Sequence, residues 1–474
     1  MKQEVGFVQK INKFTAYLDG LPEVKVNDIV ENENGMMGWV TALLPNLVEV
    51  LFLKEGDVRP GDMFTKSDKR LTLPLGNFLL SRVINPLGEV IDGGRPVPPK
   101  GAKDVVYPES LDNMAPDMGN RKFIDRQLDT GITLIDTLVP IGKGQRELIM
   151  GDPRSGKAGF IMDVISNLRD TGIVVVYGII GKSLSAMRSV ISAIADRGAL
   201  PYTVVVAAPS TDPAPLIYLT PQTVFTIAEY FQKQGKDVLV ILSDMGVHAK
   251  IYREISLLAS QTPGRESYPG DIFYQHAHLM ERGGNFIQGG SITVLPTIEL
   301  DLNDFSTYIP TNLMGMTDGH LLFRSSLASQ GDNPAIDVTL SVTRVGRQTQ
   351  DHVQELLSTL VRQTLARAAG LETLSQFSFE LPPETRALFK QAAQIKELLK
   401  QPSGLFIPKE VQTMLLALPY TKFLMEKDVE FVEKNKLLII ENLKKIKIEA
   451  TDEQDLIKKL DEIYGHDQSN QKNP

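Results

Sequence analysis

The segment GDPRSGKAGF, residues 151–160, has the residue types and spacing of a phosphate-binding loop. In the motif G-x-x-x-x-G-K-[ST], backbone N–H groups hold the phosphates, the lysine neutralises them and the last hydroxyl binds Mg²⁺. Here Ala158 follows Lys157, so the hydroxyl is missing. The sequence therefore predicts a phosphate loop with an impaired metal position. The candidate binding residues of this loop are Gly151, Asp152, Pro153, Arg154, Ser155, Gly156, Lys157 and Ala158.

A second candidate for metal chemistry is Asp244, which ends the apolar run DVLVILSD. In phosphate-loop proteins such a strand delivers a carboxylate to Mg²⁺ at the C-terminal edge of the sheet. A buried strand that ends in a turn aspartate gives the same pattern. Because the phosphate loop is also present, we favour Asp244 as a metal candidate.

The stretches around the loop have the character that such a site needs. RELIM, before Gly151, is strand-like, and AGFIMDVI, after Lys157, is helix-like. This order directs backbone N–H groups and a helix N-terminus at a phosphate. Between about residues 71 and 350, apolar runs such as GIVVVYGII and YTVVVAA alternate with helical stretches. The pattern predicts βαβ units around a parallel sheet.

The two flanking regions differ from this central one. Residues 1–70 contain short strand-like stretches, such as EVGFVQKI and KVNDIVE, which predict a small barrel or sandwich. Residues 351–474 carry helical periodicity, as in HVQELLSTLVRQTLARAAG. The polar end from about residue 466, HDQSNQKNP, is expected to be disordered. We therefore expect three domains, over residues 1–70, 71–350 and 351–474.

The composition restricts the function classes. The 474-residue chain has a net charge of -8, which argues against a dedicated nucleic-acid binder. It has no cysteine, so disulfides, thiolate metal sites and cysteine nucleophiles are excluded. The N-terminus lacks the apolar core of a signal peptide, and no apolar run is long enough to insert into a membrane. We expect a cytoplasmic protein, free or peripheral on the cytoplasmic face of the membrane.

Longer segments carry a resemblance to a known family. LDTGITLIDTLVPIGKGQRELIMGD (128–152), PGRESYPGDIFYQHAHLMER (263–282), YIPTNLMGMTDGHLLF (308–323) and NPAIDVTLSVTRVG (333–346) closely resemble the alpha, non-catalytic subunit of the rotary F-type ATPase/ATP synthase. The resemblance implies an N-terminal β-barrel, a central α/β RecA-like P-loop nucleotide-binding domain and a C-terminal α-helical domain. It also implies beta-type catalytic subunits, alternating with this chain in a hexamer around a gamma-type central shaft.

An alpha-type rather than a beta-type subunit is indicated by the end of the strand VVVYGII. Catalytic beta subunits carry Gly-Glu there, because a carboxylate must polarise the attacking water. Alpha subunits carry Gly-Gln, and this chain has Gly181-Lys182. An ammonium group cannot act as the general base at neutral pH. The segment PGRESYPGD is also of the alpha type.

The resemblance assigns a catalytic role to Arg344 in SVTRVG. In alpha subunits the matching arginine reaches the catalytic site of the neighbouring beta subunit as an arginine finger. Such a finger is worth roughly 10³ to 10⁵ in rate. A solvated surface charge is the alternative for any single arginine.

The chain's own nucleotide site departs from the family pattern. The family loop usually reads GDRQTGKT, and its metal-side strand usually ends in two acids, whereas Ser243 precedes Asp244 here. On the adenine side Pro334 and Gln401 match, but Asn333 and Ser403 replace an arginine and a glutamine. We expect ATP or ADP to bind weakly and with little Mg²⁺, or the site to be empty. Arg154 is a candidate to contact phosphate in place of the cation.

The N-terminal helical segment with which alpha subunits engage the peripheral stalk has no counterpart before EVGFVQ, so attachment to an ordinary stator is not assumed. With these departures the chain resembles the F-type-like paralogues of mycoplasmas. Some of these paralogues form ATPases that do other work, including gliding motors. Two alternatives stay open: a self-sufficient homohexameric ATPase of the secretion or flagellar export type, and a scaffold that has lost the finger role.

Overall fold

In this computed structural model, the structure describes residues 4–98, 101–102, 105–108, 110–301, 304–375 and 382–470. The chain divides into two compact units. The first comprises Met1–Phe123, Gly144–Met150 and Arg169–Asp318, and the second comprises Ile124–Lys143, Gly151–Leu168 and Gly319–Pro474. Each unit is therefore built from three separate stretches of the chain.

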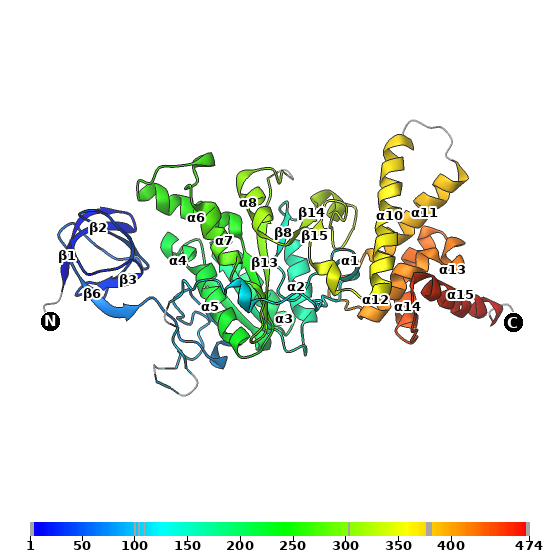
Figure 1. Ribbon diagram of the computed structural model, residues 1–474, viewed down its shortest axis with the longest axis horizontal. Helices are drawn as coiled ribbons and strands as arrows, with labels where there is room; N and C mark the ends of the chain where they lie inside the picture. The colour runs from blue at the N-terminus through cyan, green and yellow to red at the C-terminus, as the bar shows by residue number, and fades with distance from the viewer. Residues whose placement is uncertain are drawn as a thin grey trace. The chain divides into compact units, whose positions relative to one another are not determined.

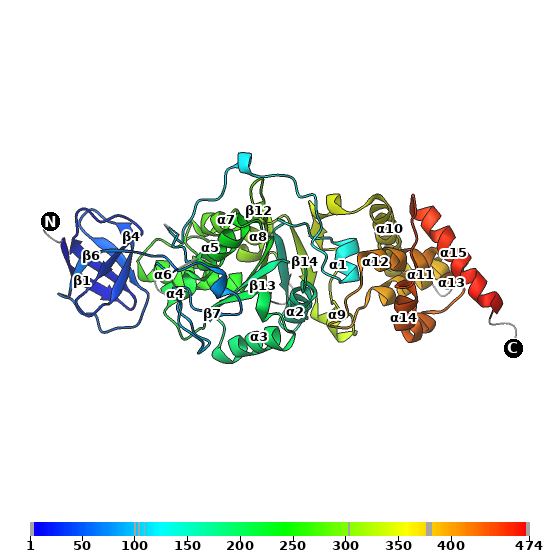
Figure 2. The same cartoon turned by 90° about the horizontal axis from the view of Figure 1, so that it is seen from below.

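The first unit begins with a closed antiparallel barrel, blue in Figures 1 and 2, whose strands follow the order β1-β2-β5-β4-β3-β6. Alternate residues, such as Val8, Val40 and Phe64, fill its interior. The barrel alternative of the prediction is confirmed, although its closing strand β6 was not predicted. The strands are β1 (Val5–Asn12), β2 (Thr15–Gly20), β3 (Asp28–Glu31), β4 (Met37–Leu43), β5 (Val48–Phe52) and β6 (Met63–Arg70).

The rest of the first unit is built around parallel strands in the order β8-β13-β11-β9-β10-β7. They are β7 (Val83–Ile84), β8 (Glu147–Gly151), β9 (Val174–Ile180), β10 (Thr203–Ala208), β11 (Val238–Ser243) and β13 (Ser291–Glu299), with β12 (Gly284–Asn285) antiparallel to β13. The helices are α3 (Leu184–Asp196), α4 (Ala214–Tyr218), α5 (Thr220–Lys233), α6 (Met245–Leu258), α7 (Ile272–Met280) and α8 (Tyr308–Met316). Helix α5 packs on β9, β10 and β11. The predicted central α/β sheet is thereby confirmed.

The second unit contains the strand pair β14 (Gly319–Phe323) and β15 (Val342–Thr343), with helices before and after it. Its C-terminal helices pack on one another, α10 against α11 and α12, and α11 against α14 (Figure 1). The predicted helical domain is thereby confirmed. The helices are α1 (Thr133–Leu138), α2 (Lys157–Asn167), α9 (Ser325–Ser329), α10 (His352–Ser375), α11 (Pro383–Leu399), α12 (Lys409–Ala417), α13 (Lys422–Met425), α14 (Val429–Leu443) and α15 (Glu453–Asn470).

The C-terminal end differs from the sequence-based expectation. Helix α15 continues to Asn470, so residues 466–470 are helical where a disordered tail was expected, and residues 471–474 lie outside the described range. Once a helix is nucleated, each added residue gains a backbone hydrogen bond, so it can extend into a polar sequence. The domain boundaries near residues 70 and 350 stay predictions. Among the described residues, no helix has both the length and the apolar character needed to cross a bilayer.

Candidate functional site

The phosphate loop joins β8 to α2, as the flanking sequence predicts. Its first glycine is required by a close approach, because a Cβ at Gly151 would lie 2.2 Å from the carbonyl oxygen of Phe323. Gly156 has φ of 95° at the N-terminus of α2, where a side chain would strain the backbone. Arg154 adopts a left-handed conformation as well, with φ of 61°. The loop is thus a sharp reversal that leads directly into a helix.

The groups of the loop are arranged around Lys157. Its ammonium group donates to the carbonyl oxygens of Gly151 and Asp152, at 2.6 and 2.5 Å. The buried Ser155 hydroxyl donates to the same Asp152 carbonyl at 2.7 Å, and Ser325 donates to the Asp152 carboxylate at 2.9 Å. These contacts hold the lysine beside the start of α2, whose N-cap makes no side-chain hydrogen bond. The positive helix end and the ammonium group together suit a phosphate chain.

The outer face of the loop is exposed at Pro153, Arg154, Gly156 and Ala158. Ala158 presents a methyl group where a metal-binding hydroxyl is needed. Within the described residues, no cluster of three or more His, Cys, Asp or Glu side chains could hold a metal ion. The loop therefore offers cations and N–H groups for phosphate, and it offers no hydroxyl ligand for Mg²⁺ at residue 158.

The metal candidate Asp244, in the first unit, has both carboxylate oxygens engaged by the backbone. Oδ1 accepts from the Val247 N–H at 3.0 Å, which caps α6, and Oδ2 accepts from the Glu299 N–H at 2.9 Å. Burial raises the pKa of Asp244 above its usual value, and the nearby charge of Lys182 counteracts this rise. An aspartate after a buried strand therefore also acts as a helix cap here, in line with the turn interpretation of the sequence.

Lys182 lies just beyond β9, at the position where the family resemblance places the catalytic carboxylate of a beta subunit. Gly181 precedes it with φ of 60°, and a Cβ there would lie 2.7 Å from a methyl group of Val247. The Lys182 carbonyl accepts from the Ser210 N–H at 2.8 Å, so the backbone is fixed. The strand end thus presents an ammonium group near the Asp244 carboxylate.

The adenine-side candidate Gln401 uses its whole side chain within the protein. Its oxygen accepts from the N–H and hydroxyl of Thr133, and its nitrogen donates to the carbonyls of Gly131 and Leu405, at 2.5–3.1 Å. A primary amide has two donors and two lone pairs, so its capacity is filled. With Gln401 4% exposed, no edge of this amide is open to a nucleobase.

The space next to Gln401 and Pro334 is small. It measures about 10 Å³, which is close to the volume of a single water molecule on this scale. The hydroxyl of Ser403 donates to the carboxylate of Asp163, one of the residues that line the space, at 2.6 Å. The adenine-side candidates Pro334 and Gln401 both line this small space. The residues around the space are Ile132, Phe160, Asp163, Asn333, Pro334, Gln401, Pro402 and Leu405.

A buried carboxylate that the sequence prediction missed supports this closed arrangement. Asp136, in α1, accepts from the N–H and hydroxyl of Thr130, from the Gly131 N–H and from the Gln412 amide, at 2.6–2.9 Å. It thereby fixes the turn whose Gly131 carbonyl binds Gln401. Burial raises the pKa of Asp136 to about 6 despite these hydrogen bonds. The only hint in the sequence is an acidic residue inside the apolar run TLIDTL.

Arg344 is exposed on a separate loop of the second unit, directly after β15. The loop is braced on both sides of the arginine. Thr343 donates its hydroxyl to the Pro140 carbonyl at 2.9 Å, and a Cβ at Gly346 would lie 1.7 Å from the same oxygen. Burial lowers the pKa of His320, and the charge of Arg344 lowers it further. A rigid backbone thus presents an exposed guanidinium group.

A parallel sheet with a strand, a glycine-rich phosphate loop and a helix defines a phosphate-loop nucleotide-binding protein. Residues 131–343 match the model described as ATP synthase alpha/beta family, nucleotide-binding domain, and residues 350–468 match the ATP synthase alpha/beta chain, C terminal domain. The chain therefore belongs to the ATP synthase alpha/beta family. The first match contains the phosphate loop, Lys182 and Asp244, and Arg344 falls between the two matched ranges.

Proposed function

We propose that this chain is the non-catalytic, alpha-type subunit of a hexameric ring in a rotary F-type-like ATPase. In this proposal beta-type subunits alternate with it around a gamma-type shaft, and the ring works in the cytoplasm or at the cytoplasmic face of the membrane. The narrower placement is a divergent paralogue of the mycoplasma type, which is supported by the departures in the phosphate loop.

The proposal depends above all on the filled amide of Gln401. An enzyme that turns over ATP must admit the nucleotide and release the product, and here protein groups occupy the hydrogen-bonding capacity on the base side. Ala158 and Lys182 add to this argument, because one removes a metal ligand and the other replaces the general base. The chain's own site then retains phosphate-binding groups, with weak ATP or ADP binding or none.

The exposure of Arg344 and the bracing of its loop support the role of an arginine finger. An arginine finger must be exposed and carried on a stiff backbone that presents it to a neighbouring subunit. The loop around Arg344 is exposed and braced by Thr343 and Gly346 against Pro140. We propose that it completes the sites for ATP hydrolysis or synthesis on adjacent beta-type subunits.

The test is to purify the chain alone and together with its beta-type partner, and to measure ATP hydrolysis by both preparations at equal concentration. The chain alone is expected to give no turnover above background, and the combined ring is expected to turn over. Robust turnover by the chain alone would overturn the proposal and favour the homohexameric export-type ATPase.

A further inference from the structure

A cavity of about 490 Å³ lies in the first unit, between the barrel and helices α4, α6 and α7. Its volume falls within the range of small-molecule sites, about 300 to 1,000 Å³. The barrel contributes Trp39 and Glu49, and the helices contribute Tyr218, Tyr252 and His278. No residue of the phosphate loop lines it, so it is a separate candidate site.

One wall of this cavity is aromatic. Trp39 stacks on Tyr218 with ring centroids 6.3 Å apart, and Tyr218 stacks on Tyr252 at 5.2 Å. The polar edges of the rings are tied down, since the Trp39 indole donates to Asn27 at 3.2 Å and the Tyr252 hydroxyl donates to Asp271 at 2.7 Å. The rings are thereby held in place. Tyr218 also stacks on His248 at 5.1 Å, so its faces are covered by protein rings, and Trp39 and Tyr252 are the rings of this wall that can attract a flat cation.

The charge of the lining is predominantly negative. Asp28, Glu49 and Asp112 contribute carboxylates, whereas the only guanidinium among the residues that line the cavity is the exposed Arg70. Asp28 is paired with Lys66 at 2.8 Å, and Asp112 accepts from His278 at 2.9 Å. Among the residues that the structure describes, no lysine lines the cavity, so a phosphorylated ligand has little to bind.

Glu49 is the carboxylate without a cationic partner. It is 6% exposed and accepts from the Thr41 hydroxyl at 2.9 Å, and within the described residues no Lys, Arg or His lies at ion-pair distance from it. Burial, together with the charge of Glu49 and the hydrogen bond between the two side chains, raises the pKa of the neighbouring Tyr17 to about 12. Both partners of Glu49, Thr41 and Tyr17, are neutral hydroxyl groups, so no positive charge balances this buried carboxylate. A cation in the cavity would supply that charge.

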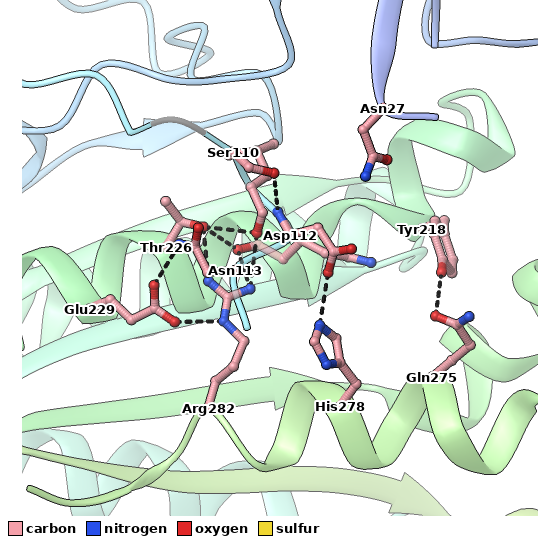
Figure 3. A network of polar contacts seen from close by, with 12 residues as sticks. Asn27, Ser110, Asp112, Asn113, Tyr218, Thr226, Glu229, Gln275, His278 and Arg282 are labelled. Carbon is pink, nitrogen blue, oxygen red and sulfur yellow. Dashed lines mark hydrogen bonds and ion pairs between the residues drawn. The ribbon is translucent and has the colours of Figure 1, made fainter. Parts of the chain in front are cut away.

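Figure 3 shows the polar contacts around Asp112, which lines the cavity. Arg282 is fully buried, with its guanidinium bound to Glu229 at 2.6 Å and to the Leu111 carbonyl at 3.0 Å. Asn113 donates to the same Glu229 carboxylate at 2.8 Å. The residues on both sides of Asp112 are therefore anchored, which fixes the position of its carboxylate.

We propose that this cavity binds a small planar organic cation of the aromatic amidine or protonated amino-heterocycle class. Its ring lies against Trp39 and Tyr252, and its charge faces Glu49, with Asp112 as the second carboxylate. This site goes beyond the proposed subunit function and does not depend on it.

The experiment uses benzamidine as the cationic probe, with benzamide as its neutral isostere and benzoate as its anionic counterpart. Trp39 is the only tryptophan of the chain, so its fluorescence reports on this wall directly. Benzamidine should give a saturable change and bind at least about tenfold more tightly than benzamide, and benzoate should not bind. No saturable change with benzamidine, or equal binding of benzamide, would overturn the proposal.

Two variants locate the binding. Glu49→Gln keeps the size of the side chain and is expected to weaken benzamidine binding about tenfold. Glu33→Gln, at an exposed glutamate outside the cavity, is the matched control and should bind as the wild type does. If Glu49→Gln does not fold, Asp112→Asn on the exposed loop is expected to weaken binding about threefold. Wild-type affinity in the folded carboxylate variants would refute the site.

Discussion

The side-chain oxygen of Gln401 accepts hydrogen bonds from both the N–H and the hydroxyl of Thr133, at 3.0 and 3.1 Å. The nitrogen of the same amide is engaged by Gly131 and Leu405. In the proposed nucleotide site, Lys157 remains beside the phosphate loop, whereas the amide of Gln401 is engaged by the protein itself.

The first prediction concerns the ligand preference of the isolated chain. Tripolyphosphate and ATP should bind with affinities within about threefold of each other, because adenine has about 10 Å³ of space beside Gln401. Isothermal titration, with Mg²⁺ and with EDTA, measures both ligands. Lys157→Ala should abolish the binding of both, since it removes the ammonium group. ATP binding more than about tenfold tighter than tripolyphosphate would show that the base side of the site opens.

The second prediction concerns stability. Gln401→Ala should lower the free energy of unfolding by about 3 kcal/mol, because it leaves the buried partners Thr133 and Gly131 without their hydrogen bonds. Denaturant titration followed by far-ultraviolet circular dichroism measures the change. Gln330→Ala, at an exposed glutamine of the same unit, is the control and should change stability by less than about 0.5 kcal/mol. Equal effects of the two substitutions would contradict a bracing role for Gln401.

The third prediction concerns Arg344 in the assembled ring. Arg344→Ala should lower ATP turnover by roughly 10³ or more, because the charge that develops on the transferred phosphoryl group loses its partner. Assembly should be unchanged, since the side chain is exposed and Thr343 and Gly346 hold the loop. Native mass spectrometry and steady-state hydrolysis measure the two properties. Arg347→Ala, at an exposed arginine nearby, should retain activity. A fully active Arg344→Ala ring would favour the scaffold alternative.

The fourth prediction concerns pH. The pKa of Asp136 is raised from 3.8 to about 6 by burial, so the folded chain holds this proton more tightly than the unfolded chain does. The stability from this group is fully present below about pH 4 and is lost as the pH rises through 6. The loss amounts to about 3 kcal/mol. Asp136→Asn should remove this pH dependence, which denaturant titrations of both proteins between pH 4 and 7 would measure. Parallel curves for the two proteins would contradict the assignment.

The sequence predicts the apolar strands of this fold well and the polar strands poorly. Apolar runs such as VVVYGII identify buried parallel strands, because both faces of the sheet are covered. The barrel strand β6, with the sequence MFTKSDKR, was missed because most of its side chains are polar and only Phe64 is buried. Its pairing with β1 and β3, rather than its composition, makes it a strand.

In the candidate site, too, some residues could be predicted from the sequence and others could not. The spacing of Gly151, Gly156 and Lys157 identifies the phosphate loop, because a local backbone geometry requires those residues. The state of Gln401 could not be predicted, since its partner Thr133 lies 268 residues away in the sequence. Whether an amide meets a ligand or the protein's own backbone is decided by such long-range contacts.

The closed base side of the proposed site has a thermodynamic consequence. A protein that needs a bound ligand to order a region gains stability only as the ligand concentration rises above its dissociation constant. In this chain the hydrogen bonds that order the region come from Gln401 and Ser403, which belong to the same polypeptide. The side chains around Thr133 and Gln401 are therefore held by hydrogen bonds within the chain, and their order needs no contribution from a bound nucleotide.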